Sequence, residues 1–151
     1  MKESRYYNVG ISRDDSHKDI LCTPEKSEKN SVIFEVGTHP EYHKGNGEIW
    51  SPEHLFVAAI SGCLETTFLA IAKNSKLEFT SFSCHAKIKL EIIEGKLMLS
   101  NIFLKPTVVL QNELFRNKTI RILKKAEYAC LIIHSIKSSI TMEIGIELNP
   151  I

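Results

Sequence analysis

The chain has 151 residues and is almost electrically neutral, with 19 lysines and arginines against 18 aspartates and glutamates. This length fits one domain, residues 1–151, that can bury a core without disulfides or metals. The charge balance argues against binding nucleic acid or a membrane surface through bulk charge. Four cysteines are too few for a disulfide-stabilised secreted scaffold.

The N-terminal third predicts two short strands separated by polar connections. Residues 1–16 contain no apolar signal segment, so we expect a cytoplasmic protein. Strands are expected at Tyr6–Ser12 and at Ser31–Val36, where Val32, Phe34 and Val36 alternate. The segments between and after them, Asp14–Asn30 and Gly37–Trp50, have the composition of loops.

A long apolar helix is predicted to begin after Ser51 and to end near Lys73–Asn74. Ser51 can cap the helix, and Pro52 and Glu53 suit its first turn. The segment Leu55–Ala72 has nearly the length of a membrane span, but Glu65 in it would be costly in lipid. We therefore predict a helix in a protein core, buried on nearly all sides, and no membrane partner.

The C-terminal half predicts a hairpin, a second helix and a last strand. Phe82–Ile92 alternates strictly, Glu94-Gly95 forms a turn, and Lys96–Leu110 returns, with Pro106 indicating an edge or an interruption. Leu114–Ile136 has helical spacing, and Ile140–Leu148 alternates again. This order predicts an α+β fold with helices on one face of a mainly antiparallel sheet.

Cys63 and Cys130 are the candidate reactive residues, because both fall on predicted helices in apolar surroundings. Buried cysteines are most often small, inert core residues, and composition alone favours that interpretation for both. The alternative is a peroxide-reducing pair, in which one thiolate attacks and a second thiol resolves the sulfenic acid. Spacing alone does not bring the two residues together.

Glu53 precedes Cys63 by ten residues, which on one straight helix is about 15 Å of rise. A hydrogen bond cannot span that distance. Glu53 would assist Cys63 only across a bend or from a second subunit, and otherwise it acts on the helix dipole.

Two segments, SPEHLFVAAISGCLETTFLAIAK and AEYACLIIHSIKSSI, resemble the OsmC/Ohr superfamily. The first resembles its N-P-E-x-L-hydrophobic-A-A-x-x-x-C helix, with Ser51 in place of the usual Asn and with Pro52, Glu53 and Leu55 matching. Cys63 falls at the peroxidatic position and Cys130 at the second cysteine of the family. The loop THPEYHKGNGEIW resembles a less-characterised branch of the superfamily.

The resemblance implies an OsmC-like fold with a buried central helix that bears Cys63 and a second helix that bears Cys130. It implies an intertwined homodimer with active sites between subunits, which would bring Glu53 to a neighbouring thiol. Cys63 would attack an organic hydroperoxide and Cys130 would form a disulfide with it. No metal, haem or flavin would be used. An external dithiol, such as a lipoyl group, would restore the thiols.

The family's peroxidases place an arginine beside the attacking thiolate, where a cation lowers the thiol pKa. Arg13 is the candidate for this role by its position near the first predicted strand. Lys44, His39 and His43 precede the Cys63 helix and are alternative sources of positive charge.

Other residues and functions are open alternatives. The scattered cysteines make a zinc site with His39 and His43 improbable, and Cys84 is expected in the core. His134, four residues after Cys130, either contacts the site or is a hydrogen-bonded or exposed histidine. The fold could also serve as a non-enzymatic module that binds a small hydrophobic ligand.

Overall fold

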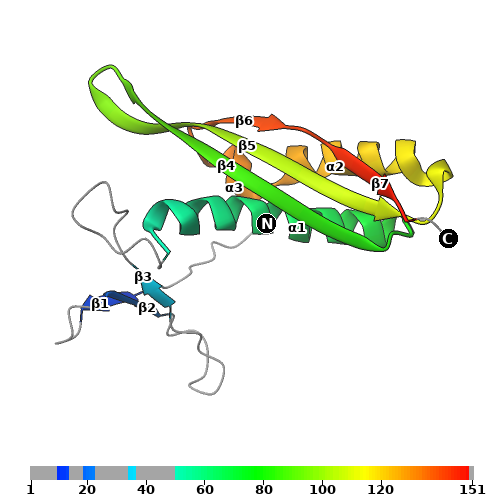
Figure 1. Cartoon of the computed structure of the whole chain (residues 1–151), viewed down its shortest axis with the longest axis horizontal. Coiled ribbons are helices and arrows are strands. Elements are labelled where there is room, and N and C mark those ends of the chain that lie inside the picture. Colours follow the sequence, from blue (N-terminus) through cyan, green and yellow to red (C-terminus); the bar gives the residue numbers. More distant parts are fainter. Residues whose placement is uncertain (1–9, 14–18, 23–33, 37–49, 150–151) are drawn as a thin grey trace, which may run out of the picture. The chain divides into compact units, whose positions relative to one another are not determined.

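The computed structural model places two compact units along the chain, residues 1–55 and residues 56–151 (Figure 1). It describes these segments: residues 10–13, 19–22, 34–36 and 50–149. Of the expected loop at 37–50, residues 37–49, with His39, His43 and Lys44, lie outside them.

The first unit contains a three-stranded antiparallel sheet of β1 (Gly10–Arg13), β2 (Asp19–Cys22) and β3 (Phe34–Val36). β1 and β3 lie at the strands predicted at 6–12 and 31–36, β1 ending one residue later. The prediction of a connection over 14–30 is wrong at β2, which is a strand. Its apolar run Ile20-Leu21-Cys22 is short and lies among polar residues. The sequence there lacks the alternation of apolar and polar residues that predicts a strand.

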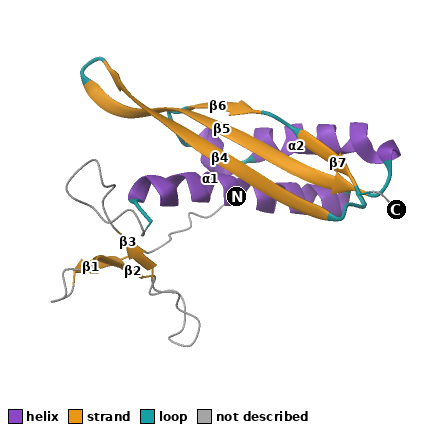
Figure 2. Ribbon diagram, in the orientation of Figure 1, coloured by secondary structure: helices purple, strands orange, loops and turns teal. Residues whose placement is uncertain are grey.

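The second unit is a four-stranded mixed sheet with helices on one face (Figure 2). Its elements, with α1 starting in the first unit, are α1 (Pro52–Asn74), β4 (Ser81–Ile93), β5 (Lys96–Leu110), the 3₁₀ helix η1 (Glu113–Phe115), α2 (Arg116–Ala129), α3 (Leu131–His134), β6 (Ser139–Met142) and β7 (Gly145–Leu148). β5 is the central strand. It pairs antiparallel with β4 and parallel with β6 and β7, so the sheet predicted to be mainly antiparallel is mixed.

Both ends of α1 are fixed by local hydrogen bonds. Ser51 precedes the helix, and its hydroxyl accepts from the His54 backbone N–H at 3.4 Å while His54 Nδ1 accepts from the Ser51 N–H at 3.1 Å. At the other end Lys76 has a positive φ of 50°. The N–H groups of Lys76 and Leu77 then bond to the carbonyls of Lys73 and Ala72, which is a Schellman C-cap.

Only one stripe of α1 is fully buried, so the prediction of burial on nearly all sides is wrong for the single chain. The buried side chains recur every fourth residue, at Ile60, Leu64, Phe68 and Ala72. On the opposite side Leu69 is 41% exposed. By length and composition α1 could cross a membrane, but core helices pass the same test, and this stripe packs into the protein core.

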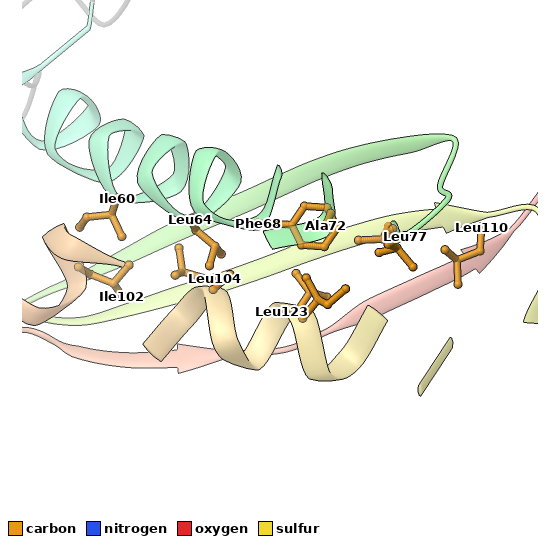
Figure 3. Packing of buried hydrophobic residues seen from close by; sticks show 12 residues of the cluster. Ile60, Leu64, Phe68, Ala72, Leu77, Ile102, Leu104, Leu110 and Leu123 are labelled. Atoms are coloured by element: carbon orange, nitrogen blue, oxygen red, sulfur yellow. The ribbon is translucent and has the colours of Figure 1, made fainter. Parts of the chain in front are cut away.

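The core lies between the helices and the inner face of the sheet (Figure 3). Phe68 of α1 stacks on Phe82 of β4 with ring centroids 4.9 Å apart, and it meets Phe79 edge-on at 5.4 Å. The buried residues of β5 are the even-numbered ones, as expected for a half-buried strand. Ile122, Leu123 and Ala126 of α2 complete this core.

The β4–β5 hairpin turns at Glu94-Gly95, as predicted. Both residues have positive φ, 49° and 75°, which is the two-residue turn that matches the twist of the flanking strands. The antiparallel register shifts once, between Lys89 and Leu90.

Pro106 explains why the predicted last strand, 140–148, is divided into β6 and β7. Both segments keep one register with β5, from Asn101 opposite Ser139 to Leu110 opposite Leu148. Between them the Glu143 N–H still donates to the Leu104 carbonyl at 2.8 Å. The next donor of the ladder would be residue 106, and proline has no N–H. Pro106 therefore marks an interruption of a central strand.

Gly145 is required by close packing against its partner in β5. A Cβ at this position would lie 2.8 Å from Oγ1 of Thr107. We expect Gly145→Ala to lower the free energy of unfolding by about 1–3 kcal/mol, as overpacking does, and Thr107→Ala in the same chain to recover most of the loss. Urea denaturation of the three proteins checks this, and equal stability of Gly145→Ala and the wild type would contradict it.

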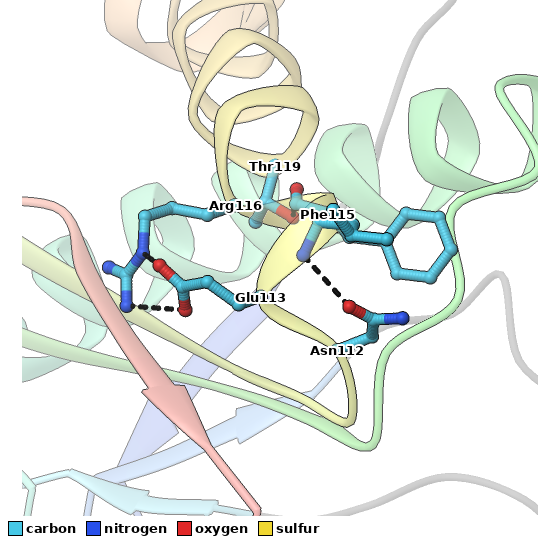
Figure 4. A network of polar contacts seen from close by, with 6 residues as sticks. Asn112, Glu113, Phe115, Arg116 and Thr119 are labelled. Atoms are coloured by element: carbon cyan, nitrogen blue, oxygen red, sulfur yellow. Dashed lines mark hydrogen bonds and ion pairs between the residues drawn. The ribbon is translucent and has the colours of Figure 1, made fainter.

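The chain enters α2 through a hydrogen-bonded turn (Figure 4). The Asn112 side chain accepts from the Leu114 N–H at 2.9 Å, and the Thr119 hydroxyl donates to the Phe115 carbonyl at 2.9 Å. Arg116 and Glu113 form an exposed ion pair. These contacts satisfy the buried Thr119 side chain and orient the helix that leads to Cys130.

Candidate functional site

Cys63 and Cys130 lie side by side in the second unit, although 67 residues separate them. Their sulfur atoms are 2.8 Å apart, with the Cys130 thiol donating to Cys63. A disulfide bond is about 2.05 Å long, so less than 1 Å of approach would join the two sulfurs. The spacing of the two cysteines in the sequence did not show that they meet, and the fold brings their sulfur atoms together.

The two thiols differ in exposure. Cys130 is fully buried, whereas Cys63 is partly open to solvent on α1. A reagent from solution therefore meets Cys63 first. The carbonyl of Cys63 accepts hydrogen bonds from the Thr67 and Thr66 hydroxyls at 2.7 and 3.2 Å, two threonines whose role we did not predict. The sequence indicates these contacts through spacing, because the two threonines follow Cys63 by three and four residues on one helix.

Cys130 lies at a break between α2 and α3, and not within a helix as predicted. Its ψ of 111° is extended, and its N–H turns back to the Glu127 carbonyl at 3.3 Å. The predicted helix 114–136 is thus three pieces: η1, α2 and α3. The sequence gives no sign of this break, because neither glycine nor proline occurs near it.

Burial raises the pKa of the Cys130 thiol to about 11, and the contact with Cys63 acts in the same direction. The backbone N–H groups of Ile133 and Ile132, in α3, oppose this shift. Cys130 therefore holds its proton at neutral pH.

The raised pKa of Cys130 predicts a pH-dependent loss of stability. The unfolded chain releases this proton near 9.0 and the folded chain only near 11, so the stabilisation is complete below pH 9 and is lost between these values. We expect reduced wild type to lose more stability from pH 8 to 10.5 than Cys130→Ala does, measured by urea denaturation. Parallel pH profiles would contradict the assignment.

Cys84, on β4, packs against the core as expected and is a separate thiol. Burial raises its pKa, partly offset by a hydrogen bond with Ser61 and another with the Lys105 backbone, while the nearby charge of Glu65 adds to the increase. Burial outweighs the two hydrogen bonds, so the net shift of the Cys84 pKa is upward, and Cys84 provides a control for the other two thiols.

The other predicted site residues belong to the first unit or lie outside the described residues. Glu53 lies in the first turn of α1, as predicted. Arg13 is in β1, and Lys44 lies outside the described residues. Over the described segments, no group of three or more histidine, cysteine, aspartate or glutamate side chains is arranged to hold a metal ion.

His134 lies next to the Cys130 turn. Its backbone N–H donates to the Cys130 carbonyl at 3.3 Å. Its ring nitrogen Nε2 contacts the Tyr128 carbonyl, and its ring meets the Tyr128 ring nearly perpendicularly at 5.8 Å. His134 therefore bridges the end of α2 and the short α3.

Comparison with known proteins defines the class of this fold. Residues 45–145 match the family of OsmC-like proteins, and the chain belongs to that family. No curated protein sequence matches it.

Three solved structures show the likeness. An OsmC-like protein of unknown function from Vibrio cholerae is 20% identical, with a TM-score of 0.77 over 93% of this chain and 99% of that one. An organic hydroperoxide resistance protein from Elizabethkingia anophelis is 18% identical, with a TM-score of 0.73 over 99% and 100%. An organic hydroperoxide resistance protein OsmC from Legionella pneumophila is 17% identical, with a TM-score of 0.70 over 95% and 99%. At these identities the likeness defines the fold.

Proposed function

We propose that this protein reduces organic hydroperoxides with the Cys63–Cys130 pair. The observation that carries the proposal is the 2.8 Å contact between one partly exposed and one fully buried thiol. Two structural neighbours are organic hydroperoxide resistance proteins. An inert core cysteine needs no second thiol at this distance.

The difference in exposure between the two thiols supports Cys63 as the attacking thiol and Cys130 as the resolving thiol. The Cys63 thiolate attacks the terminal oxygen of the hydroperoxide, an S–O bond forms, the O–O bond breaks, and the alkoxide leaves and takes up a proton as an alcohol. Cys130 then attacks the sulfenic acid sulfur. The S–S bond forms, the S–O bond breaks, and hydroxide leaves with the Cys130 proton as water. An external dithiol, such as a lipoyl group, reduces the disulfide by thiol–disulfide exchange.

The partly open face of α1 supports the homodimer as part of the proposal. Leu69 is 41% exposed, and Ala59, Thr66 and Ala70 are also exposed on this helix. A second copy of the chain would bury this small and apolar face, and could bring its Glu53 and a cation such as Arg13 or Lys44 to the thiolate. We expect Leu69→Lys to shift sedimentation from dimer to monomer, and a wild type that stays monomeric at micromolar concentration would exclude this assembly.

Peroxide consumption by the wild type tests the proposed reaction. Cumene hydroperoxide and hydrogen peroxide are compared, with dihydrolipoamide as the reductant. We expect turnover with a preference for the alkyl hydroperoxide, together with a Cys63–Cys130 disulfide after oxidation without reductant. Reduced Cys63 in excess peroxide would reject the enzyme. Saturable stabilisation by a small apolar ligand that persists in Cys63→Ser would then favour the binding module.

A further inference from the structure

The break at Cys130 interrupts the helical hydrogen bonding between α2 and α3, so the last carbonyl groups of α2 need other donors. Among these is the Tyr128 carbonyl, which the His134 ring nitrogen Nε2 reaches from α3. A carbonyl oxygen only accepts hydrogen bonds, so Nε2 of His134 must carry a proton in this contact. The His134 side chain thus caps the end of α2.

His134 also closes the turn from its backbone, since its N–H donates to the Cys130 carbonyl at 3.3 Å. His134 therefore holds the turn at two carbonyl groups, that of Tyr128 near the end of α2 and that of Cys130 itself. The perpendicular packing of the His134 and Tyr128 rings restricts the side chain further. By contrast, the Ser135 hydroxyl bonds only within α3, to the Leu131 carbonyl at 2.9 Å.

We propose that His134 is a positioning residue that holds the α2–α3 turn closed and thereby keeps the Cys130 sulfur against Cys63 for disulfide formation. This inference rests on the proposed function. His134 is exposed, and none of its contacts described above involves a sulfur atom, so it acts through the backbone around Cys130.

The closed turn has a chemical consequence for the resolving thiol. Burial opposes ionisation of Cys130, and the N–H groups of Ile133 and Ile132 favour it. These N–H groups belong to α3, the segment that His134 ties to α2. When the contact is lost, Cys130 loses both its fixed distance to Cys63 and the donors that assist its attack.

The test separates the two oxidation steps. Each protein is mixed with cumene hydroperoxide, and Cys63 sulfenic acid and the Cys63–Cys130 disulfide are measured by rapid quench and mass spectrometry. We expect His134→Ala to form sulfenic acid at the wild-type rate and the disulfide roughly tenfold more slowly, the equivalent of one lost hydrogen bond. Equal disulfide rates in His134→Ala and the wild type would overturn the inference.

Matched variants distinguish positioning from general destabilisation. We expect His134→Gln, which keeps an N–H donor, to recover most of the rate, and His134→Phe, which keeps only the ring, to remain slow. Ser135→Ala removes a hydrogen bond within α3 and should leave the rate unchanged. If His134→Ala does not fold, the rates of disulfide formation in His134→Gln and His134→Phe are compared instead. A His134→Gln variant as slow as His134→Phe would overturn the role of the N–H donor.

A second measurement keeps this inference separate from the peroxidase proposal. The equilibrium between the Cys63–Cys130 dithiol and its disulfide is measured in dithiothreitol redox buffers, without peroxide. We expect His134→Ala to shift this equilibrium about tenfold toward the dithiol, whether or not the wild type reduces peroxide. A wild type that forms the disulfide here but ignores peroxide would reject the enzyme and leave the positioning role standing. An unshifted His134→Ala equilibrium would reject the positioning role.

Discussion

Replacement of Cys63 by serine is expected to lower peroxide consumption roughly 10³-fold or more, as removal of a catalytic nucleophile does. The hydroxyl of serine stays protonated at neutral pH and does not attack the O–O bond. Consumption of cumene hydroperoxide with dihydrolipoamide measures this loss. Wild-type activity in Cys63→Ser would contradict the assignment of the nucleophile.

Cys130→Ser should have a different effect, because the partly exposed Cys63 is still present. We expect one equivalent of peroxide to be consumed and then a stalled Cys63 sulfenic acid, seen as a gain of one oxygen atom in the intact mass. Cys84→Ser is the matched control, since Cys84 lies on β4 and is a thiol separate from the Cys63–Cys130 contact, and it should turn over like the wild type. A stall in Cys84→Ser would show that the resolving thiol is misassigned.

Truncation of Phe68 to alanine is expected to cost about 3–5 kcal/mol of unfolding free energy. Phe68 is fully buried and packs on the rings of Phe79 and Phe82. Its loss leaves a cavity between α1 and β4 and removes two aromatic contacts. Urea denaturation of the reduced protein measures the change.

An exposed residue of α2 provides the control. Lys124 is exposed on this helix, so Lys124→Ala should change stability by no more than about 0.5 kcal/mol. A cost of Phe68→Ala below about 1 kcal/mol would contradict the packing described for this core.

Local signals in the sequence predict the elements that local chemistry fixes. Ser51 and Pro52 mark the start of α1, and Glu94-Gly95 marks the hairpin turn, because caps and two-residue turns depend on neighbouring residues. The parallel pairing of β5 with β6 and β7 was not predicted, since alternation shows which face is buried and not the direction of a partner strand.

The candidate site was only partly predictable for the same reason. The cysteines were found from their apolar surroundings and the family motif, but their contact arises from the packing of α1 against the end of α2. The break at Cys130 depends on tertiary structure, and no local breaker residue announces it. The open face of α1 was missed because an apolar sequence does not tell whether its own chain or another covers it.

The parallel register of β5 also determines when the thiol pair can assemble during folding. The β4–β5 hairpin joins two consecutive strands through a two-residue turn. By contrast, each residue of β5 that pairs with β6 or β7 is 38 residues from its partner, as Ile102 is from Ile140. Contacts distant in sequence carry a larger loop-closure cost. We therefore expect the hairpin to form early, and the crossover through α2 and α3, which carries Cys130 to Cys63, to form late. A newly made chain would then expose Cys63 to an oxidant before Cys130 reaches it.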